Sequence, residues 1–417
     1  MKTVLVIYPH WPPSNLVGVH RVRLLVNEMP ALGWNPIVLT VDERDYENEG
    51  APGSESLVDP QVTVIKVRAR APLHIFSRRT IGDIGLRGWH AMRHAAHRIL
   101  EEHPIDFIWF SLPSWYPCLF APSLKRRHGV QYAIDYQDPW VHLPSAHFGP
   151  FHRGLWTVRL ARMLEPRVLR SAAFVSAINQ AYMEGPIHRT QGLSAKPNVA
   201  IQLGFSARDH EHRIPEISTP WPEGKRALIY AGAYWDQGAP LFDHLLEAWR
   251  IAQLSGLLPP DAHLVFIGTG NPSLSSIHSK IQALGIENSA IEHPNRIPYL
   301  NVLDLLHRAH ASIVLGSTAK HYSASKVFQL LIAKKPILAH LHAESEARDI
   351  LRASDADAFF CPFHAEGNPA DIKQLSECLG QIFQASDWRP NLTAIEQHSA
   401  LNAARKLTVA FETALTR

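Results

Sequence analysis

Cysteine is scarce in this sequence, and the scarcity limits the class of protein. The 417 residues include three cysteines, Cys118, Cys361 and Cys378. Three cysteines are too few for a disulfide framework, and none of them has the paired spacing of a metal-binding motif. We therefore expect a protein of a reducing compartment, the cytoplasm.

Long hydrophobic runs are also missing. No stretch reaches the roughly 18 apolar residues that a membrane-spanning helix needs. The first apolar stretch, Val4–Tyr8, ends at Pro9 and is too short for the hydrophobic region of a signal peptide. The sequence therefore predicts neither a secreted protein nor an integral membrane protein.

Several motifs of known chemistry are absent or incomplete. Gly268-Thr-Gly270 lacks the third glycine of a dinucleotide-binding fingerprint, and there is no Walker motif or nucleophile elbow. Asp355-Ala-Asp357 has the spacing of a metal-binding pair, but it precedes an apolar stretch instead of following one. The pairs His210/His212 and His340/His342 lack a convincing further zinc ligand. We expect no metal and no other cofactor.

Short apolar stretches alternate with segments of helical periodicity along the chain. This alternation predicts an α/β protein with parallel sheets and helices on both faces. Pro215, Pro220 and Pro222 interrupt the alternation once. We place an N-terminal domain at 1–205, a linker at 206–225, a C-terminal domain at 226–390 and a last segment at 391–417. The expected strands are 4–8, 37–41, 62–67, 107–111, 132–135, 173–177, 227–231, 263–268, 312–316 and 336–339. In addition, 290–292 is strand-like, and Phe359 and Phe360 are candidates for a last strand.

The two predicted domains are Rossmann-like and doubly wound, and we expect them to face each other across a cleft. Ligands of such sheets bind outside the carboxyl ends of the strands. The last segment contains a helix, expected at 393–415, which could pack back on the N-terminal domain. This organisation is typical of a nucleotide-binding enzyme.

Charge is distributed unevenly between the two halves. Residues 1–205 carry six more basic than acidic side chains, whereas the remainder carries three more acidic ones. A basic half suits an anionic partner, such as a phosphate, a nucleotide or an anionic membrane face; we expect no nucleic acid. The basic, partly amphipathic stretches 84–100 and 151–170 suit either peripheral membrane contact or ordinary domain helices with solvated arginines.

Six segments, taken in order, resemble the motifs of one protein family. In the first half they are Trp11–Arg21, Leu32–Thr40 with its GW-P-VLT pattern, and Asp135-Tyr-Gln-Asp-Pro-Trp140. In the second half they are Tyr230–Gly232, Phe266–Gly270 and Ser325–Leu338. Together they resemble the GT-B glycosyltransferases, specifically the family-four-like branch of bacterial surface-polysaccharide enzymes, over essentially the whole chain.

The resemblance implies an acceptor site on the N-terminal domain. Gly18, in the turn before a helix, lets the backbone approach a ligand, and His20 and Arg21 open that helix. Asp138 is expected to accept a hydrogen bond from a sugar hydroxyl, and Trp140 to cover a sugar face. Alternatively, Arg21 is simply solvated and Asp138 is a turn former before a proline.

On the C-terminal domain the resemblance implies a donor site. Ser325 and Lys326 are expected near the donor diphosphate, and Gly232 is expected to allow backbone contact with the phosphates. His321 and Gln329 stand where the family typically has two glutamates, so Gln329 would bind ribose hydroxyls as a neutral residue. The loop 233–238 lacks the usual basic residue, and Arg296 is expected to supply that charge.

The sequence therefore predicts a glycosyltransferase. It would move a sugar from a nucleotide diphosphate-sugar donor to a hydroxyl of a glycan or lipid-linked acceptor, at the inner face of the membrane if the acceptor is lipid-linked. The resemblance implies catalysis without a metal and with retention of configuration. Two alternatives stay open: a nucleotide-sugar epimerase of the same fold, and a non-catalytic binding protein, suggested by the missing glutamates.

Overall fold

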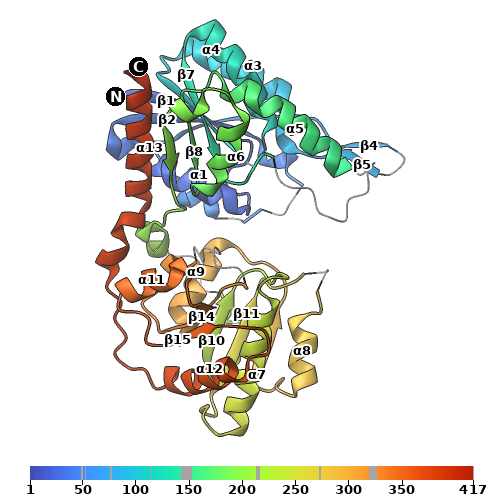
Figure 1. Cartoon of the computed structure of the whole chain (residues 1–417), viewed down its shortest axis with the longest axis vertical. Coiled ribbons are helices and arrows are strands. Elements are labelled where there is room, and N and C mark those ends of the chain that lie inside the picture. Colours follow the sequence, from blue (N-terminus) through green and yellow to red (C-terminus); the bar gives the residue numbers. More distant parts are fainter. Residues whose placement is uncertain are drawn as a thin grey trace. The chain divides into compact units, whose positions relative to one another are not determined.

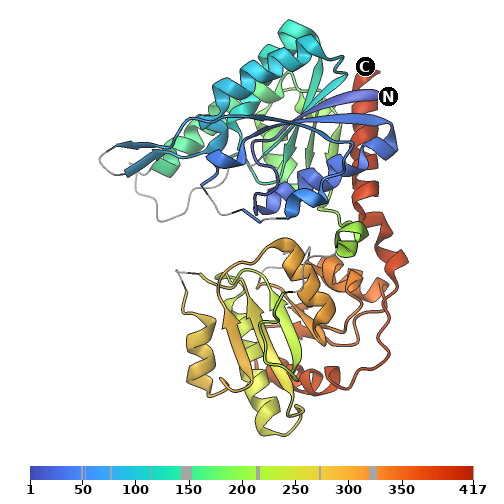
Figure 2. The same ribbon diagram turned by 180° about the vertical axis from the view of Figure 1, so that it is seen from behind.

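The protein forms two compact units, Met1–Ser206 with His398–Arg417, and Ala207–Gln397. They are seen in a computed structural model (Figures 1 and 2). The structure describes residues 1–47, 50–51, 53–75, 78–112, 114–141, 153–212, 217–271, 274–318 and 326–416.

Unit 1 contains a seven-stranded parallel sheet in the order β3-β2-β1-β6-β7-β8-β9. A separate antiparallel hairpin, β4–β5, follows β3. The strands are β1 (Lys2–Ile7), β2 (Trp34–Val41), β3 (Thr63–Val67), β4 (Leu73–Ile75), β5 (Arg78–Ile81), β6 (Phe107–Ser111), β7 (Gln131–Tyr136), β8 (Phe174–Ala177) and β9 (Asn198–Ala200). The helices are α1 (Val17–Glu28), α2 (Ile84–Arg87), α3 (Trp89–Glu102), α4 (Ala121–His128), α5 (Arg153–Leu169), α6 (Ala181–Arg189) and α13 (Ala400–Leu415).

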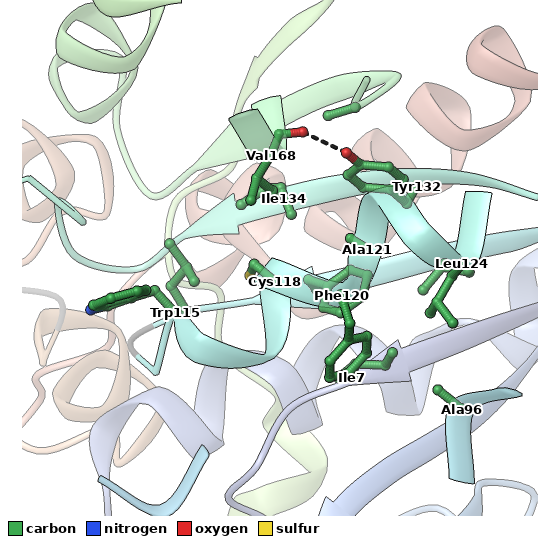
Figure 3. Close-up of a cluster of buried hydrophobic side chains, with 14 of the residues drawn as sticks. Ile7, Ala96, Trp115, Cys118, Phe120, Ala121, Leu124, Tyr132, Ile134 and Val168 are labelled. Atoms are coloured by element: carbon green, nitrogen blue, oxygen red, sulfur yellow. Dashed lines mark hydrogen bonds between the residues drawn. The ribbon is translucent and has the colours of Figure 1, made fainter. Parts of the chain in front are cut away.

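Both faces of this sheet are covered by helices, because its strands are apolar on both sides. In β1, Leu5 and Ile7 join one core with residues of α3, α4 and α5. Figure 3 shows part of that core, in which the Tyr132 hydroxyl donates to the Val168 carbonyl. Val4 and Val6 point to the other face, where α1 and α13 pack. Alternation along one strand thus builds two separate cores.

The last helix of the chain is part of unit 1. Phe411 on α13 stacks on Phe107 of β6 with ring centroids 4.6 Å apart. The expected helix at 393–415 is interrupted, since a short 3-10 helix, η7 (Leu392–His398), precedes it. Ser399 then caps α13 by accepting a hydrogen bond from Asn402 N.

Unit 2 contains a six-stranded parallel sheet in the order β12-β11-β10-β13-β14-β15. Its strands are β10 (Arg226–Ala231), β11 (Ala262–Ile267), β12 (Ala290–His293), β13 (Ala311–Leu315), β14 (Ile337–His342) and β15 (Phe360–Phe363). Its helices are α7 (Ala239–Leu254), α8 (Ile277–Leu284), α9 (Tyr299–Arg308), α10 (Val327–Ile332), α11 (Glu346–Ala353) and α12 (Pro369–Ile382), and the 3-10 helix η6 (Ala207–Glu211) precedes them.

Two buried histidines of unit 2 form a hydrogen-bonded chain that fixes their protonation. Gly367 N donates to His244 Nε2 over 2.9 Å, so His244 carries its proton on Nδ1. His340 Nδ1 donates to the Cys361 carbonyl, which leaves His340 Nε2 to accept from His244 Nδ1 at 3.3 Å. Both rings are therefore neutral. Burial lowers the pKa of His244, and it lowers that of His340 to about 4.

The hydrogen-bonded pair of His244 and His340 predicts a loss of stability in mild acid. In the unfolded protein His340 takes up a proton near pH 6.5, whereas in the folded protein it stays neutral down to about pH 4. The free energy of unfolding should fall as pH drops from about 6.5 to about 4, by on the order of 3 kcal/mol for this residue. Urea unfolding at several pH values measures it.

The matched variants are His340→Asn and His278→Asn, the second replacing an exposed histidine of unit 2. We expect His340→Asn to be less stable at pH 7 but to show a flatter pH dependence, and His278→Asn to behave like the wild type. Equal slopes for wild type and His340→Asn would show that the buried chain does not set the acid sensitivity.

Candidate functional site

Three residues from the predicted donor-site segments follow β10, β11 and β12 and lie at the carboxyl edge of the unit 2 sheet. Gly232 follows β10, Gly268 follows β11, and Arg296 lies shortly after β12. Gly268 has a φ of +76°, and a Cβ there would lie 3.7 Å from Arg296 Cγ and 3.9 Å from the Gly232 carbonyl. The sheet therefore brings Gly232, Gly268 and Arg296 together at the edge where such sheets bind ligands.

A buried carboxylate holds the loop after β11 in place. Thr269 Oγ1 donates to Glu292 Oε1 over 2.6 Å, and Glu292 Oε2 accepts a hydrogen bond from the backbone of His278 at the start of α8. Both bonds lie within unit 2. The sequence motif Gly268–Gly270 gave no sign of this anchor, because its partner is 23 residues away.

Lys326 supplies a cation at this edge. Its side chain lies over the ring of Tyr230, with Nζ 5.0 Å from the ring centroid and 3.5 Å from the hydroxyl oxygen, to which it donates. Tyr230 in turn donates to the Ala233 carbonyl over 2.8 Å. A Cβ at position 232 would lie only 1.5 Å from Lys326 Nζ. The ammonium group of Lys326 can therefore occupy this position only because residue 232 is a glycine.

No carboxylate among the described residues neutralises the charge of Lys326. Burial, and then the nearby positive charge of Arg296, lower the pKa of Lys326 to about 8. Among the described residues, no carboxylate raises the pKa of Lys326 or lies within ion-pairing distance of its Nζ. Two neighbouring cations, one of them desolvated, are an arrangement that an anionic ligand would stabilise.

Gln329 lies on α10 and is fixed by a histidine pair. His210 Nε2 donates to Gln329 Oε1 over 2.6 Å, so His210 Nδ1 accepts from His307 Nε2 at 2.9 Å. His210 belongs to η6 and His307 to α9, and burial lowers the pKa of both rings. Sequence reasoning considered His210 only as a metal ligand. Within the described part of the chain, no group of His, Cys, Asp and Glu residues could hold a metal ion.

Two predicted donor-site residues, His321 and Ser325, lie outside the described residues. Lys326 stands directly before α10, and this helix has only six residues.

In unit 1, Gly18 lies against side chains that end at the same edge of the sheet. A Cβ at Gly18 would lie 2.3 Å from Gln137 Oε1 and 2.5 Å from the Tyr8 hydroxyl. Gln137 Nε2 donates to Ser111 Oγ over 2.8 Å. The space that Gly18 leaves open is therefore filled by these protein side chains.

Asp138 and His20 lie near this group. Asp138 is exposed at the end of β7, and partial desolvation raises the pKa of its carboxyl. Its charge acts on Tyr8 and on Tyr182 of α6, whose pKa values it helps to raise. His20 is half-buried on α1. The carboxyl group of Asp138 is thus available at the carboxyl edge of the sheet.

Arg21 is buried in an ion pair. It is 2% exposed and donates to both carboxylate oxygens of Asp135, from Nε at 2.9 Å and Nη2 at 2.8 Å. Its Nη1 donates to the Ile201 carbonyl over 2.6 Å. Ser111 and Ser176 also donate to Asp135, which is fully buried. The guanidinium group is not solvated, and it joins α1 to β7 and to the segment after β9.

Trp140 is also buried. Its side chain is 4% exposed and stacks on Trp115, with ring centroids 5.0 Å apart. Contact between its face and a sugar would require the ring to leave this stack.

Comparison with known proteins relates the first half of the chain to a protein family. Residues 18–204 match the family model described as "Glycosyl transferase 4-like domain". No curated protein sequence matches the chain.

Solved structures with the same fold include several glycosyltransferases. Sucrose-phosphate synthase from Thermosynechococcus elongatus is 13% identical, with a TM-score of 0.57 and 100% coverage of both chains. HepE from Anabaena, in complex with UDP, is 13% identical with a TM-score of 0.54, covering 99% of this chain and 100% of its own. TarM from S. aureus is 10% identical with a TM-score of 0.59, covering 99% of this chain and 100% of its own.

These findings confirm the α/β fold and the family resemblance. The two parallel sheets have the GT-B fold of these structures, and residues 18–204 of unit 1 match a glycosyl transferase 4-like domain. Among the described residues, none of the helices combines the length and the hydrophobicity of a membrane-spanning segment.

Proposed function

We propose that unit 2 binds the diphosphate of a nucleotide diphosphate-sugar donor at Lys326 and Arg296. The single observation that carries the proposal is Lys326, a desolvated cation beside a second cation and over a glycine, with no carboxylate among the described residues to neutralise it. HepE, which shares the fold, was crystallised with UDP and with UDP-glucose. A diphosphate group at this edge would satisfy both cations.

The sugar is then transferred to a hydroxyl of a glycan or lipid-linked acceptor held by unit 1, where Asp138 accepts a hydrogen bond from that hydroxyl. As the bond from the sugar to the diphosphate breaks, negative charge develops on the leaving phosphate. Lys326 and Arg296 stabilise this charge without a metal ion. The leaving phosphate oxygen takes the proton of the acceptor hydroxyl, and the sugar keeps its configuration.

Gln329 binds a ribose hydroxyl through its amide group, and His210 is its positioning residue. His210→Ala removes the hydrogen bond to Gln329 Oε1, so we expect the KM for the donor to rise about fivefold while kcat changes little. His210→Asn keeps a donor near Gln329 and should restore part of the loss. His212→Ala, an exposed neighbour, is the control. If His210→Ala lowered kcat and left the KM unchanged, this role would be wrong.

A product assay tests the proposed function against its alternatives. The protein is incubated with UDP-, GDP-, ADP- and dTDP-glucose, with and without a lipid extract as acceptor, and the products are separated by chromatography. A transferase releases a nucleoside diphosphate in an acceptor-dependent reaction. Formation of an epimeric nucleotide-sugar without acceptor would instead indicate an epimerase. Donor binding without any product would indicate a non-catalytic binding protein.

A further inference from the structure

Helix α5 of unit 1 exposes a row of large apolar side chains. Trp156, Leu160 and Met163 are 57%, 41% and 50% exposed. Their spacing of four and three residues places them on one face of the helix. The opposite face, with Val158, Ala161 and Val168 among its residues, is buried against unit 1. Figure 1 shows α5 on the outside of this unit.

The exposed charged side chains of α5 itself are all of one sign. Arg159, Arg162 and Arg167 are exposed along α5, and the Arg159 guanidinium lies over the Trp156 ring at 5.2 Å. The helix has a single acidic residue, Glu165, and its side chain is fully buried. It accepts from the Tyr136 hydroxyl over 2.9 Å and from Arg189 Nε over 2.8 Å. The exposed side of α5 therefore combines an apolar row with charged side chains of its own that are all cationic.

We propose that the exposed side of α5, defined by Trp156, Leu160, Met163 and the three arginines, binds an anionic membrane surface. Apolar side chains with an aromatic residue enter the boundary between head groups and acyl chains, and arginines beside them pair with lipid phosphates. A second copy of the chain fits worse, because the arginines of two such helices would repel each other. Membrane binding by α5 is independent of the proposed function. Only its link to catalysis rests on that function, since a lipid-linked acceptor would reach unit 1 at this surface.

Vesicle flotation tests this surface with the full chain. One set of vesicles contains phosphatidylcholine alone, and the other also contains phosphatidylglycerol. We expect the protein to bind the anionic vesicles about tenfold more strongly or better, and to lose this preference at high salt. Tryptophan emission gives a second measurement. Because the chain has 11 tryptophans, the wild type is compared with the variant that lacks Trp156, and insertion of the Trp156 indole ring should add a shift to shorter wavelength in the wild type alone.

Two variants separate the apolar and the cationic contributions. Trp156→Ser with Leu160→Ser should reduce flotation about tenfold, and Arg159→Gln with Arg167→Gln should remove the preference for anionic lipid. Leu254→Ser, which replaces an exposed leucine of unit 2, should bind like the wild type. Unchanged thermal midpoints would show that the variants are folded.

Three results would overturn the proposal: equal binding to neutral and anionic vesicles, flotation that the α5 variants do not change, or self-association that they abolish. Nucleotide binding is measured on the same samples. A protein that floats but binds no nucleotide would refute the proposed function and support the membrane surface. A protein that binds a nucleotide but does not float would refute the membrane surface and support the proposed function.

Discussion

Replacing Lys326 by methionine is expected to lower sugar transfer by about 10²- to 10³-fold, the usual cost of removing one group that stabilises charge in the transition state. Methionine has a similar length but no charge. Because burial already disfavours the ammonium form of Lys326, its removal should not lower the thermal midpoint. Initial rates with the best donor of the product assay, together with the thermal midpoint, measure both effects.

Lys373→Met is the matched control, since Lys373 is an exposed lysine on α12 of the same unit. It should leave the transfer rate unchanged. Normal transfer by Lys326→Met would contradict the donor-site assignment. If Lys326→Met lost activity because it unfolds, Gly232→Ala would be the decisive variant, since a Cβ at position 232 displaces the same ammonium group.

The lowered pKa of Lys326 adds a pH dependence to nucleotide binding. Below about pH 8 the side chain is protonated and attracts a diphosphate, whereas above that pH it becomes neutral. Affinity for a nucleoside diphosphate should therefore fall as pH rises through about 8 in the wild type. In Lys326→Met this fall should be absent.

The second large effect concerns stability. Arg21→Met is expected to destabilise the protein by about 3–5 kcal/mol, because it leaves Asp135 as a buried charge without its partner. Arg68→Met, which breaks an exposed pair with Asp45, should cost at most about 1 kcal/mol. Urea unfolding of both variants measures the difference.

The double variant Arg21→Met with Asp135→Leu separates the pair from its parts. Because both charges are then absent, we expect it to recover much of the lost stability. If Arg21→Met kept its stability but raised the KM for an acceptor, Arg21 would act on substrate, as the sequence motif suggested.

Much of the fold could be predicted from the sequence, because its buried strands are short apolar stretches separated by helical periodicity. The expected strands occur in both sheets, with ends shifted by a few residues. The edge strand β9 and the β4–β5 hairpin were not expected. β9 has three residues that are half-buried or exposed, so no apolar run marks it. The break at Ser399 was also missed, since the helical periodicity continues across it.

The candidate site was less predictable, because its groups meet only in the folded protein. The glycines that follow strands are visible in the sequence, but the side chains beside them are not. Gln137 fills the space beside Gly18, and the Lys326 ammonium group fills the space beside Gly232. Arg21 was expected to meet a ligand, yet its partner Asp135 lies 114 residues away. The partner of Gln329, His210, is 119 residues distant.

A thermal-shift panel with the wild type and Lys326→Met tests the central claim most directly, that the edge of unit 2 around Lys326 binds a nucleoside diphosphate. The ligands are UDP, GDP, ADP, CMP and dTDP, alone and with sugars attached. A ligand at 100 times its Kd should stabilise the wild type by about 2.7 kcal/mol. We expect one nucleotide to raise the wild-type midpoint clearly and to raise that of Lys326→Met much less. The absence of any shift in the wild type, or equal shifts in both proteins, would contradict the account.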